Sequence, residues 1–544
     1  MKKRSMLALT IIPFVMMATA AGCGSAQATV KATNNQPLVV IPGLQPAFLD
    51  NFNPFSSSAL TGTLGLIYEP LYYFNTAGPQ VYPLLATSYT WSHHNTVLTV
   101  NLRPGVMWSN DKPMTVQDVV YSYDILKQFP ALDVNAVWTK ISSVSALNAH
   151  QVQFVFKTAD VPYLETLLGS IYIVPKSVWS HVANPAQYTN PKPIGTGPYL
   201  LKSFNQETVT FVANPHYWGG EPKVKTVEYL DYTGNESATL ALTSGKIDWT
   251  GLFIPHINKV FVSKDPAHNH YWFSPSGPLM LYPNLKDPLL SQLPVREAIS
   301  YGINRTQLWK EGEYGYEKPA TTPTSLALPL ESAWLPSNLA VNKVHLSYDP
   351  AKAEKILTQA GYHKNSQGIF VSPQGQPLEF TLEVPTGWTD WDTDCSLMAN
   401  QLQAIGIKVT VQQEAFGTYY SNLSTGHYQL AMSWTDMGAT PYYLYKGLLG
   451  PNNWEQWSNS VTTQDLEKFK TSSSPQQQHQ AIDQIAEITA RQLPAIPLLY
   501  GVNWYEYNDS AFTGWPNANN PYAAPQPWTT PAEAIVITHL KPRG

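Results

Sequence analysis

Cysteine is almost absent from this chain of 544 residues, which contains only Cys23 and Cys395. Two cysteines cannot form the disulfide framework of a small secreted domain, and they cannot supply a cysteine-based zinc site. Cys395 falls in a stretch with helical periodicity, where we expect it to be buried. The fold must therefore rest on an apolar core, which 43% hydrophobic and 12% aromatic residues can supply.

Charge is also scarce. Charged residues make up 13% of the chain, about half of the usual share of roughly 25%. The formal net charge is −5, and no basic stripe gives the electrostatic footprint of a nucleic-acid-binding protein. We therefore expect no nucleic acid as a partner. The length is too great for one compact core and predicts two or three domains.

Long apolar runs are missing except at the N-terminus. Lys2, Lys3 and Arg4 precede a mostly apolar stretch over 6–18, which is too short to span a bilayer comfortably, and Ala20-Ala21-Gly22-Cys23 follows. This pattern predicts a lipoprotein signal peptide over 1–22, with Cys23 as the lipid attachment site. Acyl chains on Cys23 would anchor an extracytoplasmic protein to the membrane through a polar tether over 23–36. The alternative is an ordinary secretory signal with a cysteine there by chance.

Catalytic and metal-binding motifs are missing as well. The chain has no Gly-x-Ser-x-Gly elbow, no His-Glu-x-x-His helix and no Walker A loop. We therefore expect no enzyme, no metal and no cofactor. Asp392 and Asp394 leave a hydrolase open as a remote alternative, because glycosidases use paired carboxylates. The histidines at 93, 94, 268 and 270 stand among turn residues, where we expect exposed side chains.

Three helices are indicated by their caps. Thr115 and Asp118 form a capping-box pattern before an apolar stripe. Asp349 can cap a helix that begins at Pro350, and Pro294 opens another helix. These start signals are local, so they fix where each helix begins but not what it packs against.

Residues 378–434 alternate between strand and helix patterns. Strands are expected over 378–384, 407–411 and 428–434, with a helix over 394–405. Such alternation predicts a largely parallel sheet, and ligands bind beyond the carboxyl ends of its strands. That edge would gather a set of mostly aromatic candidate ligand-binding residues: Trp388, Trp391, Phe416, Tyr419, Tyr420, Trp434 and Asp436. The alternative is that these aromatic residues belong to the core.

Several segments, taken in order, resemble the family 5 extracellular solute-binding proteins, which bind oligopeptides, dipeptides or nickel. The resemblance runs over nearly the whole chain after the N-terminal signal. The segments are Asn53-Pro54-Phe55, 67–71, 102–108, 113–119, Gly195-Thr196-Gly197-Pro198-Tyr199, 214–218, Gly245 with Asp248, 295–305 and 493–498. Asn53 and Phe55 are carried over as candidate ligand-binding residues.

The resemblance implies an α/β protein with the two-lobed type II periplasmic-binding-protein fold. The first lobe would span 37–285, with an extra subdomain over 81–192 and a return of residues 510–544. The second lobe would span 286–509. Such a protein closes on a solute between its lobes and delivers it to the membrane permease of an ABC importer. We expect it to act as a monomer.

The sequence leaves two classes of solute open, peptides and sugars. Peptide binders of this family hold the amino terminus with an aspartate three residues after a tryptophan, in a loop that ends with proline. In Trp434–Pro441 that position is Met437, and Asp436 lies one residue earlier. Tyr442 and Tyr443 resemble the branch of the family that binds oligosaccharides. We expect a short oligopeptide first, and a cello- or manno-type oligosaccharide as the alternative.

Overall fold

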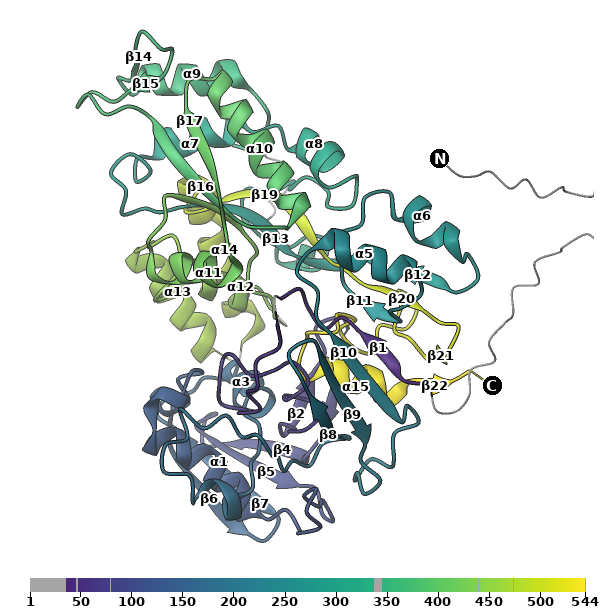
Figure 1. Cartoon of the computed structure of the whole chain (residues 1–544). Helices are drawn as coiled ribbons and strands as arrows, with labels where there is room; N and C mark the ends of the chain where they lie inside the picture. The colour runs from purple at the N-terminus through teal and green to yellow at the C-terminus, as the bar shows by residue number, and fades with distance from the viewer. Residues whose placement is uncertain are drawn as a thin grey trace, which may run out of the picture.

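The computed structural model describes residues 36–543, apart from 46, 79, 337–344, 439 and 473. The expected signal peptide, Cys23 and nearly all of the tether lie outside these residues. Figure 1 shows three bodies, each built around its own sheet. Among the described residues, every helix is too short or too polar to cross a membrane.

The first lobe is built on a seven-stranded sheet with the order β12-β20-β11-β1-β10-β9-β8. Its centre is parallel, because β1 pairs in parallel with β10 and β11. Alternation of buried and half-buried residues explains β10, where Val227 and Tyr229 face the core. The strands are β1 (Leu38–Val40), β8 (Tyr199–Phe204), β9 (Thr208–Ala213), β10 (Thr226–Leu230), β11 (Trp249–Thr250), β12 (Asn269–Tyr271) and β20 (Glu506–Asn508). The helices are α5 (Asn235–Thr243), α6 (Ile257–Val260), η2 (Val262–Lys264) and α15 (Ala532–His539).

The second lobe is built on a five-stranded sheet with the order β17-β16-β18-β13-β19. The strands are β13 (Ser274–Pro283), β16 (Glu379–Pro385), β17 (Lys408–Glu414), β18 (Leu430–Ser433) and β19 (Ile496–Asn503). The helices are α7 (Leu293–Gly302), α8 (Arg305–Gln307), the π-helical η3 (Leu308–Gly312), η4 (Ser332–Trp334), α9 (Pro350–Gln359), α10 (Thr389–Ala404), α11 (Phe416–Thr425), α12 (Pro441–Leu449), α13 (Ser460–Thr471) and α14 (Pro475–Gln492). As the alternation predicted, β16 is parallel to both β17 and β18.

A separate four-stranded sheet, ordered β4-β5-β7-β6, lies within 81–192, the stretch that we expected to be an extra subdomain. Its elements are β4 (Ala86–Ser92), β5 (Val97–Leu102), α1 (Val116–Gln128), η1 (Pro130–Leu132), α2 (Val137–Lys140), β6 (Ile141–Asn148), β7 (Gln151–Phe156), α3 (Tyr163–Gly169) and α4 (Lys176–Trp179). Three two-stranded pairs complete the strands: β2 (Tyr72–Phe74) with β3 (Val81–Pro83), β14 (His363–Lys364) with β15 (Phe370–Val371), and β21 (Phe512–Thr513) with β22 (Lys541–Pro542).

The chain crosses between the two lobes twice. It leaves the first sheet after Tyr271 and enters the second as β13 at Ser274; it leaves β19 at Asn503 and returns as β20 at Glu506. By sheet membership β13 belongs to the second sheet and β20 to the first, and our lobe boundaries at 285/286 and 509/510 stay predictions. β13 and β19 pair with each other from Ser274 with Asn503 to Leu281 with Ile496. The turn residues Ser274-Pro275-Ser276-Gly277-Pro278 stand at the first change of sheet.

The expected helix caps form. The amide of Thr115 donates to Asp118 Oδ2 at 2.8 Å, and the carboxylate of Asp349 accepts from the amide of Lys352 at 2.9 Å. The helix that we expected over 394–405 begins earlier, at Thr389. Asp390 and Asp392 stand in its first turn, where burial raises the pKa of both carboxyls. Cys395 is buried, as expected.

Candidate functional site

A cavity of about 540 Å³ lies where the lobes meet. That volume is typical of small-ligand sites, which occur preferentially at domain interfaces. Both lobes and both crossings line it. The first lobe gives Gly43, Leu44, Asn235, Gly251, Phe253, Gln526 and Trp528; the crossing strands and the residue after them give Ser276, Gly277, Leu279, Gly501, Val502, Asn503 and Trp504; the second lobe gives Glu317, Trp388, Asp390, Trp391, Phe416 and Trp434.

Four aromatic side chains form the second-lobe wall of the cavity. They follow the carboxyl ends of the parallel strands β16, β17 and β18, where the sequence predicted them. The ring centroid of Trp388 lies 4.9 Å from that of Trp391, 5.6 Å from that of Phe416 and 6.2 Å from that of Trp434. These rings make a continuous apolar surface rather than isolated contacts.

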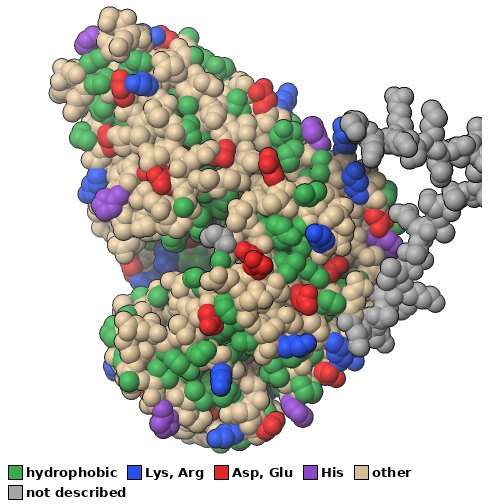
Figure 2. Space-filling view, in the orientation of Figure 1, with side chains coloured by type: hydrophobic (Ala, Val, Ile, Leu, Met, Phe, Trp, Pro, Cys, Tyr) green, Lys and Arg blue, Asp and Glu red, His purple; other side chains and the backbone are tan. Residues whose placement is uncertain are grey.

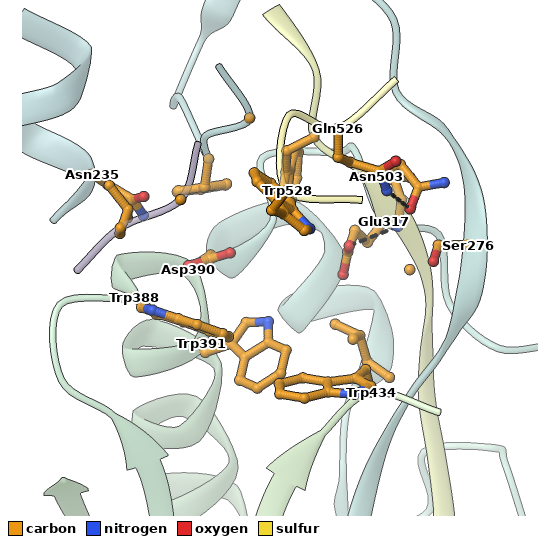
Figure 3. Close-up of a pocket in the computed structure, with 18 of the residues that line it drawn as sticks. Asn235, Ser276, Glu317, Trp388, Asp390, Trp391, Trp434, Asn503, Gln526 and Trp528 are labelled. Atoms are coloured by element: carbon orange, nitrogen blue, oxygen red, sulfur yellow. Dashed lines mark hydrogen bonds between the residues drawn. The ribbon is translucent and has the colours of Figure 1, made fainter. Parts of the chain in front are cut away.

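Aromatic rings also face the cavity from the opposite side. Figure 3 shows Trp528 across the space from Trp388, Trp391 and Trp434. Gly251 leaves room for the Trp528 ring in this position, because a Cβ added at Gly251 would lie only 2.5 Å from that ring. A flat solute in the cavity would therefore have aromatic planes on two sides.

The polar lining consists of amides, a hydroxyl and carboxyls. Asn235 Nδ2 lies 3.4 Å from Thr389 Oγ1 in the other lobe, and the amide of Gln526 donates to Asn503 Oδ1. No lysine, arginine or histidine lines the cavity among the residues that the structure describes. Burial raises the pKa of Asp390 to about 7 and raises the pKa of Glu317 well above its usual range.

Asp436 and Tyr420 do not line this cavity. They line a smaller cavity of about 260 Å³, which shares Trp434 with the large one. Lys446 and Glu455 line the smaller cavity too. The Asp436 side chain is exposed, and the positive charge of Lys446 favours the ionised form of its carboxyl. Figure 2 shows a hollow between the second lobe and the body that contains β4–β7, with charged side chains at its walls.

Four of the residues that we expected to bind ligand lie within the packed interior of the protein. The Asn53 side chain is 1% exposed and donates to the carbonyls of Pro185 and Tyr188. The other three are packed in the core. The Phe55 ring lies edge-on to Trp179, and the Tyr419 hydroxyl donates to the carbonyl of Met432. The Tyr442 ring is stacked on Phe469. All four side chains are buried and line neither cavity.

Tyr443 reaches from one lobe to the other. Its hydroxyl donates to the carbonyl of Pro162, just before α3, at 2.6 Å. Tyr443 therefore joins α12 to the body that contains β4–β7, and it lines neither cavity.

Sequence reasoning missed the first-lobe and crossing residues of the cavity. Asn235, Phe253, Asn503, Gln526 and Trp528 come from segments far apart in the chain. None stands at the end of a recognised parallel strand, so no periodic pattern marked them.

The carboxylate pair behind the remote hydrolase alternative does not face the cavity. Asp394 has no exposed surface, and neither Asp392 nor Asp394 lines the cavity.

Comparisons with known proteins agree with this architecture. The chain is 27% identical over 436 residues to the nickel-binding periplasmic protein of Escherichia coli, covering 76% of this chain and 77% of that protein. It is 23% identical over 427 residues to the oligopeptide-binding protein AppA of Bacillus subtilis, covering 74% and 75%.

Solved structures share the fold. A periplasmic oligopeptide-binding protein of an ABC transporter from Thermotoga maritima, with mannohexaose bound, superposes with a TM-score of 0.85 at 26% identity; the match covers 94% of this chain and 99% of that one. AppA of Bacillus subtilis, in complex with a nonapeptide, gives 0.78 at 20% identity, covering 94% and 99%. The expected α/β two-lobed type II fold is thus confirmed. The family model for bacterial extracellular solute-binding proteins, family 5, matches residues 80–456, and the chain therefore belongs to this family of ABC-importer binding proteins.

Proposed function

We propose that this protein captures a short oligosaccharide between its lobes and presents it to the permease of an ABC importer. The observation that carries the proposal is the lining of the large cavity: aromatic planes from both sides, amide side chains and no basic residue among the described lining residues. Pyranose rings have one apolar face that packs on an indole, and their hydroxyls pair with amide and carboxyl groups.

A peptide fits this lining less well. Its terminal carboxylate would enter a low-dielectric cavity without a cationic partner, and an unpaired buried charge is costly. The sequence led us to expect an oligopeptide first, with Asp436 as the partner of its amino group. Asp436 instead lines the smaller cavity, beyond Trp434. The Thermotoga maritima structure with mannohexaose supports a sugar, while AppA with its nonapeptide keeps peptides as the second candidate.

Isothermal titration calorimetry on the protein without residues 1–22 tests the solute class. Cello- and manno-oligosaccharides of two to six units are titrated beside pools of peptides of the same lengths. We expect saturable binding of at least one glycan series and a smaller radius of gyration by X-ray scattering in its presence, because only the closed state contacts a solute from both lobes. Peptide binding with no glycan binding would reject the proposal.

Membrane attachment through Cys23, the action as a monomer and the delivery to a permease complete the proposed function. Cys23→Ala, expressed in a host that processes lipoproteins, should move the protein from the membrane fraction to the soluble fraction and remove the acyl mass. A parent protein without acyl mass would reject the anchor and leave the solute proposal untouched. Light scattering of the purified protein checks the monomer.

A further inference from the structure

A row of four aromatic rings leads from the large cavity to the smaller one. Trp388 and Phe416 line the large cavity, Tyr420 lines the smaller one, and Trp434 lines both. The ring centroid of Phe416 lies 5.6 Å from that of Trp388 and 6.1 Å from that of Tyr420. Figure 3 shows two of these rings, Trp388 and Trp434, along one side of the large cavity. The aromatic row is therefore unbroken between the two cavities.

The rings of the aromatic row have nearly the same orientation. The plane of the Phe416 ring makes an angle of 26° with that of Tyr420 and 23° with that of Trp434, and the last two are 11° apart. The three centroids are 6.1, 6.3 and 6.5 Å from one another. In a column of stacked rings the outer pair would be about twice as far apart as the neighbours. The rings therefore lie beside one another, as adjoining parts of one surface.

Two rings of the aromatic row are open to solvent. The exposed fractions are 47% for Phe416 and 45% for Tyr420. Both belong to α11 and stand one turn apart, so their side chains project from the same face of that helix. Single exposed apolar side chains are common, but adjoining ones that continue a cavity are typical of a binding surface.

Polar side chains and one more ring complete the smaller cavity. Asp436, Lys446 and Asn452 line it and are exposed, so they can form hydrogen bonds with a ligand there. The Trp454 ring stands at 87° to that of Tyr420 and forms a wall beside it. The smaller cavity thus combines an exposed aromatic face with hydrogen-bonding groups around it, as the large cavity does.

We infer that the solute extends past Trp434 and that one of its sugar units lies on Tyr420 in the smaller cavity. The inference rests on the proposed function and deepens it, because it makes the protein selective for chain length. The large cavity, with aromatic planes on two sides, holds the first units, and the exposed rings of α11 hold those that follow. A repeating glycan suits such a row, since it offers a similar apolar face at each unit.

Chain length is the variable that tests this inference. Cello- and manno-oligosaccharides are titrated by calorimetry from the dimer to the hexamer. The large cavity alone can hold a dimer, whereas a longer chain also covers the ring of Tyr420. In the series that binds, we therefore expect the hexamer to bind at least about tenfold more tightly than the dimer.

Variants locate the effect. Tyr420→Ala should weaken binding of the hexamer about fivefold or more and leave the dimer within about twofold, whereas Trp388→Ala should weaken both. Tyr420→Phe retains the ring and should retain most of the hexamer affinity. Tyr348→Ala is the matched control, because Tyr348 is 49% exposed and lines neither cavity. Thermal melting shows whether each variant is folded.

The possible outcomes separate this inference from the proposed function. Equal affinities of the dimer and the hexamer would overturn the inference, and so would a loss in Tyr420→Ala that the dimer or Tyr348→Ala shares. In both cases the proposed function stands. Should Tyr420→Ala fail to fold, the length dependence of the parent decides. Absence of binding by every glycan would instead reject the proposed function.

Discussion

Replacement of Trp434 by alanine tests whether aromatic stacking dominates solute affinity. Trp434 is half-buried at the end of β18 and lines both cavities. Its ring centroid lies 6.0 Å from that of Trp391 and 5.9 Å from that of Trp454. Trp434 therefore forms part of the aromatic wall and also separates the two cavities. Its loss should remove a stacking surface and open one cavity into the other.

The expected magnitude follows from the area of contact. A sugar face that covers about 70 Å² of the indole contributes roughly 1.8 kcal/mol at ~25 cal/mol per Å². Such a loss weakens Kd by roughly 20-fold. Trp434→Phe keeps a ring in the wall and should lose less than half of this free energy. Water that enters the joined cavities can add to the effect but cannot cancel it.

Calorimetry with the best-binding glycan measures the change, and thermal melting shows whether each variant remains folded. Trp91→Ala is the control, since Trp91 packs on Phe156 in the body that contains β4–β7 and lines neither cavity. An unchanged Kd for folded Trp434→Ala would refute the stacking argument. A loss that Trp91→Ala shares would show that the effect is on the fold and not on the site.

Three further predictions concern closure and stability. Tyr443→Phe removes the hydrogen bond to Pro162 O and should weaken solute affinity roughly two- to tenfold through faster release, measured by stopped flow; an unchanged off-rate would contradict it. Thr115→Ala should lower the free energy of unfolding by about 0.5–2 kcal/mol in urea titrations, with solute affinity unchanged. Burial raises the pKa of Asp248 and Asp390 to about 7, so the folded chain holds protons that the unfolded chain releases above about pH 4. Their contribution to stability is lost as the pH rises from about 4 through 7, and calorimetric melting should occur at a higher temperature at about pH 5 than at about pH 8; the reverse order would refute this.

The second-lobe wall could be predicted because its signals are local. Strand periodicity over 378–384 and 407–411 predicted parallel pairing, and parallel strands place their carboxyl ends at one edge. Trp388, Phe416 and Trp434 were therefore expected to lie at the same edge of the sheet, independently of how the rest of the chain folds. The same reasoning could not separate Tyr419 from Tyr420. They are neighbours on one helix, and only the packing of α11 decides that Tyr419 is buried and Tyr420 exposed.

The opposite wall could not be predicted, because nothing local determines it. Trp528 and Gln526 reach the cavity only because the chain returns to the first lobe after β19. The family resemblance carried Asn53 and Phe55 forward as ligand-binding residues, yet the Asn53 amide is satisfied by two carbonyls of its own lobe. A segment shared across a family of folds can be shared for packing, and only the hydrogen-bond partners distinguish packing from binding.

Glu317 links solute capture to the crossing between the lobes. Glu317 lines the cavity, and its Oε1 accepts from the amide of Val502 on β19, the strand by which the chain returns to the first lobe. The next residue, Asn503, accepts from Gln526 of that lobe. A solute that contacts Glu317 therefore contacts a carboxyl that is already attached to the crossing strand. A solute favours the closed state to the extent that its contacts there are better than in the open state.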